Sequence, residues 1–466
     1  MENKEKIDGL SMEELIIDKP SDVKTKDKKV KKTKKDKKKP KEKKVKEKKT
    51  KKEKPAKEKK EVDKKNKKKF IIIALISLIV IVGIIFGTLF FLKEDAQNNT
   101  EPEIIVTTEP EDVVEKYSFS FIGVGDALLH TGVYLDAATN YVGADGYRVY
   151  DFHHQFTHIA EAIKDYDLKF YNQETIIGGK NLGLSSYPCF NSPDEIGLNL
   201  MDIGFNIVNL ATNHTLDKGS RGAIYSANFW HTKENVLAVG SYRSLEERNN
   251  IQIREENGIT YAVLSYTYGT NGIPVPSGYE YLVNVWPVDN WSKYQAYKAQ
   301  VQADVASIKD KVDVIMVSMH WGTEYQLGKY NTYQQDAANY LSSLGVDVII
   351  GTHPHVVQPV EFVNDTLVIY SLGNFISGQG DLMKKIGAIA AFTVNKTVEN
   401  GESTIEISDV KVDLHYTYHQ NHKNYSIIPF TKLNDSLLYN YRSIYEQYKT
   451  YLNPKADSRI QVGFIK

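Results

Sequence analysis

Short apolar runs with the composition of β-strands recur through residues 117–466, and polar residues directly follow them. In chain order these polar residues are Asp126, Glu174, Asn213, His214, His320, His353, His355 and Asn374. Helical patterns lie between several runs, as at residues 290–309 and 331–344, so strands and helices alternate. The pattern predicts an α/β fold whose polar residues gather at the carboxyl ends of the strands.

Two other helical patterns are expected to carry no chemistry. Residues 435–452 place large apolar side chains at helical spacing, namely Leu438, Tyr441, Tyr445 and Tyr448. We expect this segment to pack on the core as an amphipathic helix. An earlier helical stretch carries three histidines, His153, His154 and His158. We interpret these histidines as surface residues.

The most apolar part of the chain is an uncharged run of 23 residues at positions 70–92. At about 1.5 Å per residue, a helix of this length reaches roughly 34 Å and can cross the hydrocarbon core of a bilayer. A secretory signal peptide has a shorter apolar core and a small-residue cleavage site, and neither feature is present. The run therefore predicts an uncleaved transmembrane helix.

The formal net charge of +0 conceals two parts of opposite charge. Residues 1–69 hold 31 Lys against 15 Asp and Glu, a balance of +16, and the remaining chain carries −16. Because excess lysine beside a membrane span stays inside the cell, we expect a cytoplasmic N-terminus and an extracellular C-terminal domain. The low-complexity tail is expected to be disordered and to contact anionic lipid. Nucleic-acid binding is the alternative interpretation, and no nucleic-acid partner is expected.

Residues 93–116 are acidic and without periodicity, and we expect them to be a flexible stalk before a globular domain at 117–466. With Cys189 alone, the domain cannot form an internal disulfide and must be stable through its core. Cys189 stands in the segment YPCFNSP at 187–193, which has the composition of a shaped loop and could line a substrate cleft. We interpret Cys189 as a packed residue and not as a nucleophile, since no basic partner is evident.

The residues at the strand ends have the chemistry of a metal site. Any one of them alone would more often be an ordinary surface or core residue, but coincidence is a poor account of the whole set. Imidazoles, carboxylates and an amide, without a thiolate, suit Mn, Fe or Zn. Two such ions about 3.5 to 4 Å apart activate a shared water and stabilise both the attacking and the leaving oxygen. The sequence thus predicts two divalent metal ions and hydrolysis or group transfer.

Six motifs occur in order between positions 119 and 379: GVGDALLH, YNQET, NLATNHTLDKG, MHWGTEY, GTHPHVVQPVE and SLGNFISG. Together they resemble the motifs of CapA-type poly-γ-glutamate capsule biosynthesis proteins, and the resemblance covers most of the globular part. It implies a fold similar to calcineurin-like metallophosphoesterases. That fold is a four-layer α/β/β/α sandwich with a two-metal centre between the sheets.

The resemblance also implies a set of metal ligands. The implied ligands are Asp126 and His355 for one ion, Asn213, His320 and His353 for the other, and Glu174 between them. For His130 we give equal weight to metal binding and to no role in metal binding, because many relatives have another residue there. Gln173 replaces the Leu that is commoner in the family, which leaves the role of Glu174 intact.

The remaining roles concern proton transfer and support. By the resemblance, His214 would protonate the leaving group, and Asp217 would either orient His214 or cap the following helix. Glu324 would contact a ligand or hold His320, with a surface salt bridge as the alternative. Asn172 and Asn374 are assigned to ligand support or substrate contact.

Three functions are consistent with these residues. The first is a membrane-anchored, extracellular hydrolase or transferase acting on a cell-surface polymer similar to poly-γ-glutamate. The second is a non-catalytic anchored scaffold or export subunit, which could dock other capsule-synthesis membrane proteins. The third is a generic phosphodiesterase. A domain of negative charge would repel a polyanion at long range, although salt screens this repulsion beyond about 8 Å.

Overall fold

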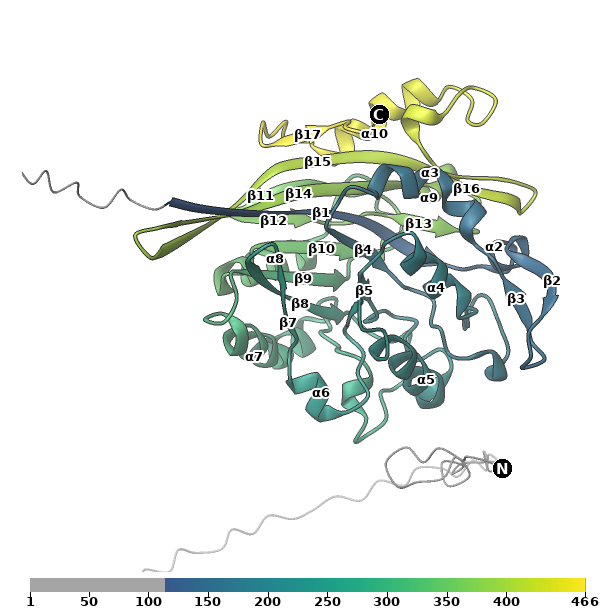
Figure 1. Ribbon diagram of the computed structural model, residues 1–466, viewed down its shortest axis with the longest axis horizontal. Helices are drawn as coiled ribbons and strands as arrows, with labels where there is room; N and C mark the ends of the chain where they lie inside the picture. The colour runs from purple at the N-terminus through teal and green to yellow at the C-terminus, as the bar shows by residue number, and fades with distance from the viewer. Residues whose placement is uncertain (1–113, 466) are drawn as a thin grey trace, which may run out of the picture. The chain divides into compact units, whose positions relative to one another are not determined.

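Residues 114–465 form a mixed α/β fold in the computed structural model, which confirms the predicted fold class (Figure 1). The predicted tail at 1–69, the predicted span at 70–92 and nearly all of the predicted stalk at 93–116 lie outside the described residues. From position 114 to 465, no helix combines the length and the apolar character that crossing a bilayer requires.

The larger sheet has nine strands: β1 (Val114–Leu128), β4 (Leu168–Asn172), β5 (Ile207–Asn209), β6 (Leu237–Val239), β13 (Asn374–Ser377), β14 (Ile386–Glu399), β15 (Glu402–Gln420), β16 (Lys423–Pro429) and β17 (Ile460–Val462). Strands β13, β1, β4, β5 and β6 are parallel neighbours. Strands β14, β15 and β16 continue the sheet in antiparallel pairing. The carboxyl ends of the parallel strands therefore meet at one edge.

The second sheet has six strands: β7 (Ile253–Glu256), β8 (Ile259–Thr267), β9 (Val314–His320), β10 (Val348–Thr352), β11 (Val360–Val363) and β12 (Thr366–Ile369). Strands β8, β9, β10 and β12 are parallel, and β7 and β11 close the two edges in antiparallel pairing. A separate hairpin consists of β2 (Ala138–Val142) and β3 (Arg148–Tyr150).

The helices of the described residues are α2 (Thr131–Asp136), α3 (His153–Ile163), α4 (Glu195–Asp202), α5 (Gly219–His231), α6 (Leu245–Asn249), α7 (Trp291–Ile308), α8 (Thr332–Leu344), α9 (Leu382–Lys385) and α10 (Tyr441–Leu452). Helices α3, α4 and α5 pack on the outer face of the larger sheet, and α7 and α8 pack on the outer face of the second sheet. Apolar side chains from both sheets share one core between them. The layers are thus helices, sheet, sheet, helices (Figure 1).

Alternation of side chains along β1 shows how the sequence builds these layers. Phe119 and Phe121 point into the core between the sheets, where the Phe119 ring lies 5.7 Å from that of Tyr261 on β8. Ile122 and Val124 point the other way and pack in the core that α3 and α4 cover. Because side chains of a strand alternate between faces, a run that is apolar at every position predicts a strand buried on both sides.

Four side chains fix the register of the parallel strands at the ends opposite the predicted site. Asp167, Asn206, Asp313 and Asp347 stand directly before β4, β5, β9 and β10. Each side chain accepts a hydrogen bond of 2.7 to 2.8 Å from a backbone N–H group of a neighbouring strand, near the start of β4, β8 and β9 and at Ser120 within β1. Because a slip of one residue would turn every side chain to the other face, these bonds help to place the opposite strand ends correctly.

The predicted helices at 290–309 and 331–344 are confirmed as α7 and α8, with Asn290 and Asn331 as their side-chain caps. The expected helix at 435–452 is partly wrong, because α10 begins only at Tyr441. Before it, the Asn434 side chain accepts hydrogen bonds from backbone N–H groups two and three residues ahead, and Asn440 has a left-handed φ of 59°. Such local bonds compete with a helix and delay its start.

The three histidines of α3 confirm their interpretation as surface residues, because His153 and His154 are exposed and His158 is half-buried. The interpretation of Cys189 as a packed residue is wrong, because its side chain is exposed. The neighbouring Phe190 and Asn191 fill the buried positions of the loop instead.

A buried histidine of β15 should make the fold sensitive to acid. His415 is 0% exposed, and neither ring nitrogen has a hydrogen-bond partner among the described residues. Burial lowers the pKa of His415 to about 3, whereas an unfolded histidine titrates near 6.5. Below pH 6.5 the unfolded chain therefore binds a proton that the folded protein does not, and stability is lost as the pH falls toward 3.

We expect His415→Leu to remove this acid sensitivity. From pH 7.5 to pH 4.5 the His415 linkage lowers the free energy of unfolding by about 2.5 kcal/mol, which the variant should retain. Urea unfolding of the full chain at a series of pH values measures the difference, with exposed His154→Leu as the control. Parallel pH profiles for the wild type and His415→Leu would contradict the expectation.

Candidate metal centre

The predicted site residues meet where the carboxyl ends of parallel strands from both sheets come together. Asp126 lies near the end of β1, Asn172 ends β4, and His320 ends β9 of the other sheet. Asn172 Nδ2 donates to Asp126 Oδ1 at 2.8 Å and lies 3.3 Å from His320 Nδ1. A buried polar contact therefore links the two sheets at this edge.

Glu174 is the most unusual side chain of the site. It is 0% exposed, and neither carboxylate oxygen has a hydrogen-bond partner among the described residues. Its Oε1 lies 3.7 Å from His320 Nε2 and 3.6 Å from His355 Nε2. Burial, followed by the nearby charge of Asp126, raises the pKa of Glu174 well above its usual value. A buried carboxylate without hydrogen bonds destabilises the folded protein unless a cation compensates its charge.

His353 and His355 complete a group with Glu174 in which one possible ligand atom of each residue lies within 4.8 Å of the others. Both histidines have left-handed backbone, with φ of 96° and 59°, on either side of Pro354. Few non-glycine residues adopt this conformation, although histidine does so more often than most, and it concentrates at functional sites. Burial lowers the pKa of His353 well below its usual value, so its ring is neutral and able to bind a metal.

Asp126 and Asn374 orient the ring of His355. Its Nδ1 lies 3.1 Å from Asp126 Oδ2 and 3.0 Å from Asn374 Oδ1, so Nδ1–H donates to these oxygens. This arrangement leaves Nε2 free and directed at Glu174. A carboxylate behind the ring is the usual partner of a metal-bound imidazole. The Asp126 carboxylate also faces the backbone N–H of His353 at 3.3 Å.

The structure brings Asn213 and His320 together as the resemblance implies. Asn213 Oδ1 lies 3.0 Å from His320 Nε2, and Thr352 Oγ1 lies 3.0 Å from His320 Nδ1. Burial lowers the pKa of His320 well below its usual value, which keeps the ring neutral. Two donor atoms suited to one cation therefore face each other beside Glu174.

His214 pairs with Asp217 next to this group. His214 Nδ1 lies 2.7 Å from Asp217 Oδ2, which also accepts the backbone N–H of Phe190 at 2.6 Å. The edge of the Phe190 ring packs on the His214 imidazole at 4.8 Å between centroids. With Nδ1–H bound to the carboxylate, Nε2 of His214 is the nitrogen available for proton transfer. The helix-cap alternative for Asp217 is wrong, because α5 begins at Gly219 after Lys218 and no side chain caps it.

Glu324 and His130 lie at the margin of the centre. Glu324 Oε1 is 4.0 Å from His355 Nε2 on a side chain that is 44% exposed. Of the two roles expected of Glu324, this position fits contact with an implied ligand, His355, and not support of His320. His130 is half-buried, with Nδ1 near the carbonyl of Leu128 and the N–H of Gly378. Burial lowers the pKa of His130 to about 4, and the rings of His355 and His214 act in the same direction.

Sequence reasoning missed two residues on the loop after β8. The Tyr268 ring lies 4.6 Å from that of His353, and Asn271 hydrogen-bonds Asn213 at 3.2 Å. The run ITYAVLSYT ends directly before Tyr268, so the rule that found the other residues applies here as well.

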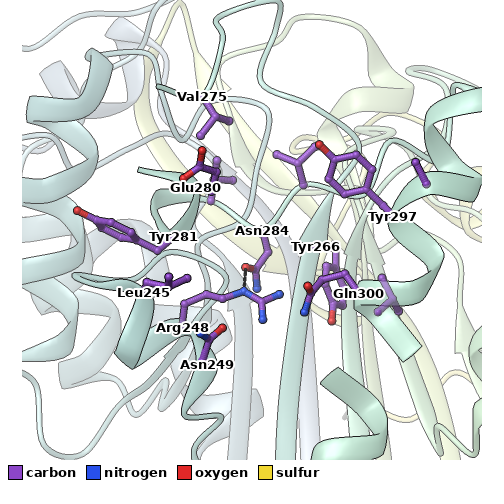
Figure 2. A pocket seen from close by; sticks show the side chains of 14 residues that line it. Leu245, Arg248, Asn249, Tyr266, Val275, Glu280, Tyr281, Asn284, Tyr297 and Gln300 are labelled. Atoms are coloured by element: carbon purple, nitrogen blue, oxygen red, sulfur yellow. Dashed lines mark hydrogen bonds between the residues drawn. The ribbon is translucent and has the colours of Figure 1, made fainter. Parts of the chain in front are cut away.

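A separate cavity of about 380 Å³ lies between α6, α7 and the loop before α7. Figure 2 shows Arg248 in this cavity, hydrogen-bonded to Asn284. The guanidinium also forms two hydrogen bonds with Asp304, at 2.7 and 2.6 Å. Because the charge of Arg248 is already paired, this cavity is poorly suited to an anionic ligand.

Comparison with known proteins gives a family match over the same segment. The family model described as "Bacterial capsule synthesis protein PGA_cap" matches residues 120–379. The chain is 29% identical over 224 residues to the PGA biosynthesis protein CapA of Bacillus subtilis (strain 168), which covers 46% of this chain and 52% of that protein. It is 24% identical over 307 residues to the capsule biosynthesis protein CapA of Bacillus anthracis, covering 62% and 66%.

These matches span between half and two thirds of the length of the two curated relatives. Among solved structures, the calcineurin-like phosphoesterase YfkN from Bacillus subtilis is similar, with a TM-score of 0.38 and 14% identity. That similarity covers 65% of this chain and 91% of the other.

Proposed function

Because the chain belongs to the family of bacterial capsule synthesis proteins described as PGA_cap, we propose that it is a metal-dependent hydrolase or transferase of an anionic surface polymer. The observation that carries this proposal is the buried Glu174 carboxylate without a hydrogen-bond partner among residues 114–465, facing the imidazoles of His320, His353 and His355. A structural core would not retain such a group without a compensating cation.

The donor set fits divalent metal ions. Glu174 offers two oxygens, and buried His353 Nδ1 also lacks a hydrogen-bond partner among the described residues. Nε2 of His355 is left free by the bond of its Nδ1 to Asp126. Imidazole and carboxylate donors without thiolate suit Mn, Fe or Zn. We propose that Asp126, Glu174, Asn213, His320, His353 and His355 hold two such ions, with Glu174 between them.

When bound, the ions would lower the pKa of a water and polarise the scissile bond. The protein's own groups then supply orientation and a proton. Asp217 holds the His214 ring, so that Nε2 can donate a proton to the leaving group. Phe190 packs on the same ring and limits its rotation. Water is restricted on this side, because His214 is only 6% exposed.

The proposed substrate is a surface polymer related to poly-γ-glutamate. Two curated relatives are described as capsule or PGA biosynthesis proteins, and the match to them covers the segment that holds the site. The bond that reacts would be a backbone amide of the polymer or an ester of similar geometry. The same family relationship supports action outside the cell, where a capsule is assembled.

Membrane attachment is part of the proposal. The apolar run at 70–92 would anchor the chain, with the Lys-rich residues 1–69 on the cytoplasmic side beside anionic lipid. The catalytic domain would then act at the outer surface, and other capsule-synthesis membrane proteins are the expected partners. Protease digestion of intact cells tests this arrangement, since only the domain from about residue 93 onward should be degraded.

Metal content measured by mass spectrometry tests the site directly. The full chain, purified in detergent without chelators, should hold about two transition-metal ions, and the His353→Ala, His355→Ala double variant should hold fewer than one. His153→Ala, His154→Ala is the matched control, because these adjacent histidines are exposed on α3. A wild-type protein that is metal-free and cannot be loaded with Mn, Fe or Zn would contradict the proposal and favour the anchored scaffold.

A further inference from the structure

A cavity of about 700 Å³ lies beside the candidate metal centre. His130 and Gly378 line it on the side of the centre, Ser186 lines it from the loop before Phe190, and His422 and Lys423 line it from the β15–β16 turn. Residues 120–379 are the part that the family model matches, so the β15–β16 turn lies beyond that segment. The cavity thus joins the shared core of the family to a further hairpin of this chain.

Ring contacts connect the cavity to the proposed proton donor. The His130 ring lies 5.2 Å from that of Phe190, at an interplanar angle of 85°. The Phe190 ring also lies 4.8 Å from that of His214, at an interplanar angle of 88°. A polymer held in the cavity would therefore extend past Phe190 toward His214 and the metal ligands.

The turn that carries His422 departs from the usual residue preference of two-residue hairpin turns. Gln420 pairs with Lys423, so Asn421 and His422 form a two-residue turn with φ of 51° and 59°. Asn-Gly is the favoured pair in such turns, because the second position disfavours a Cβ atom. His422 occupies that position, although glycine would be less strained, and local rules fail most often at functional sites.

Close packing holds the turn against the shared core. A Cβ atom on Gly132 would lie 2.9 Å from His422 Cβ, so only glycine allows this approach. The Asp136 carboxylate accepts the backbone N–H groups of Asn424 at 2.6 Å and Tyr425 at 2.9 Å. Its charge is therefore directed into the hairpin backbone, and the turn has a fixed position at the cavity.

The lining of the cavity holds one lysine, Lys423, and one carboxylate, Asp136, whereas the chain beyond residue 69 carries −16. The Asp136 side chain is 9% exposed and bound to the backbone of Asn424 and Tyr425, so the charge open to a ligand is that of Lys423. Lys423 is exposed, and no acidic partner of its ammonium is among the salt bridges of the described residues. No arginine lines the cavity, so it offers no planar fork for a bidentate contact with a carboxylate or a phosphate. A single ammonium beside imidazoles is suited to one anionic group of single charge, such as a carboxylate of the proposed polymer.

We propose that this cavity is a subsite that binds a side-chain carboxylate of the polymer next to the reacting unit, through Lys423 and His422. The inference rests on the proposed function and assigns its substrate preference to the β15–β16 turn. The subsite offsets, close to the reacting bond, the long-range repulsion between an acidic domain and an acidic chain.

Binding of a fluorescent γ-linked glutamate decamer to the metal-loaded full chain in detergent tests the subsite. His214→Ala serves as the background, to prevent turnover. The His422→Asn, Lys423→Gln double variant should bind the decamer at least tenfold more weakly, and Asn at position 422 tolerates the left-handed backbone. Lys449→Gln is the control, because Lys449 is a half-buried lysine of α10 that pairs with Glu446 and does not line the cavity, and this variant should bind like its parent.

Two further probes make the result decisive. A neutral γ-linked isoglutamine decamer, in which each free carboxylate is replaced by a carboxamide, should bind the parent and the double variant equally. If the double variant binds the glutamate decamer as tightly as Lys449→Gln does, or if the parent does not bind it, the subsite is refuted. Tighter binding of a glycerol-phosphate oligomer with the same dependence on Lys423 would overturn the assignment to carboxylates. Loss of binding in the double variant without turnover by the wild type would retain the subsite and reject the proposed reaction.

Discussion

Glu174→Gln is expected to lower metal affinity about a hundredfold or more and, at the same time, to stabilise the metal-free protein. The carboxylate is buried, and no described residue donates a hydrogen bond to either oxygen. Without an ion its charge is uncompensated, so the neutral amide of nearly equal shape should raise the free energy of unfolding by about 2 kcal/mol. Thermal unfolding with and without chelator measures both effects.

The stability that Glu174→Gln adds to the metal-free protein should increase with pH. Burial raises the pKa of Glu174, so the penalty of its charge is fully present above that folded-state pKa. As the pH falls toward the ordinary value of a glutamate, the wild type binds the proton and the advantage of Glu174→Gln disappears. Glu361→Gln is the matched control, because Glu361 is equally buried but paired with Tyr330 at 2.8 Å and with Lys455. A metal-free Glu174→Gln protein less stable than the metal-free wild type would contradict this explanation.

His214→Ala is expected to lower kcat by about 10² to 10⁴ while the metal content stays at the wild-type level, because a general acid contributes in that range. The reason is geometric: Asp217 holds Nδ1 of His214 at 2.7 Å, which fixes the ring with Nε2 free. Asp217→Asn should lower kcat less, since the amide oxygen can still accept from Nδ1–H but carries no charge to stabilise a protonated ring.

Substrates with different leaving groups distinguish the loss of proton donation in His214→Ala from a structural effect of the substitution. A substrate with a nitrophenolate leaving group needs no proton, so His214→Ala should act on it nearly as fast as the wild type does. His231→Ala is the control, because His231 is also largely buried but bonds the carbonyl of Ser241 away from the centre. Equal losses on both kinds of substrate, or loss of metal from His214→Ala, would exclude the role of general acid.

The sequence predicted where the site lies better than it predicted which residues contact the candidate ligands. Asp126, Glu174 and His320 stand at or just after the carboxyl ends of buried strand segments, and the carboxyl ends of parallel strands meet at one edge. The same rule could have found Tyr268 and Asn271. The role of Glu324 was not predictable, because its distance to His320 or His355 depends on the path of a loop.

Two other features depend on contacts that no sequence pattern records. Phe190 packs between His130 and His214 only because the loop at 187–193 folds back over the centre. The turn at His422 reaches the cavity from about 290 residues beyond His130, through the register of β15 and β16 and the small volume of Gly132. Long-range packing of this kind is fixed by the whole fold, whereas strand and helix patterns are local.

The left-handed backbone at His353 and His355 has a consequence for metal supply. Pro354 stiffens the segment between them, and the Asp126 carboxylate faces the N–H of His353 from the opposite sheet. The imidazoles are thus preset by folding, so uptake of an ion requires little reordering of the chain. Imidazole and carboxylate donors accept Mn, Fe and Zn, and the ion held in a cell depends on site geometry and metal availability as well as on affinity. The ion held by the protein would then follow in part the metals available where the chain folds, and the same chain could work under different metal limitation.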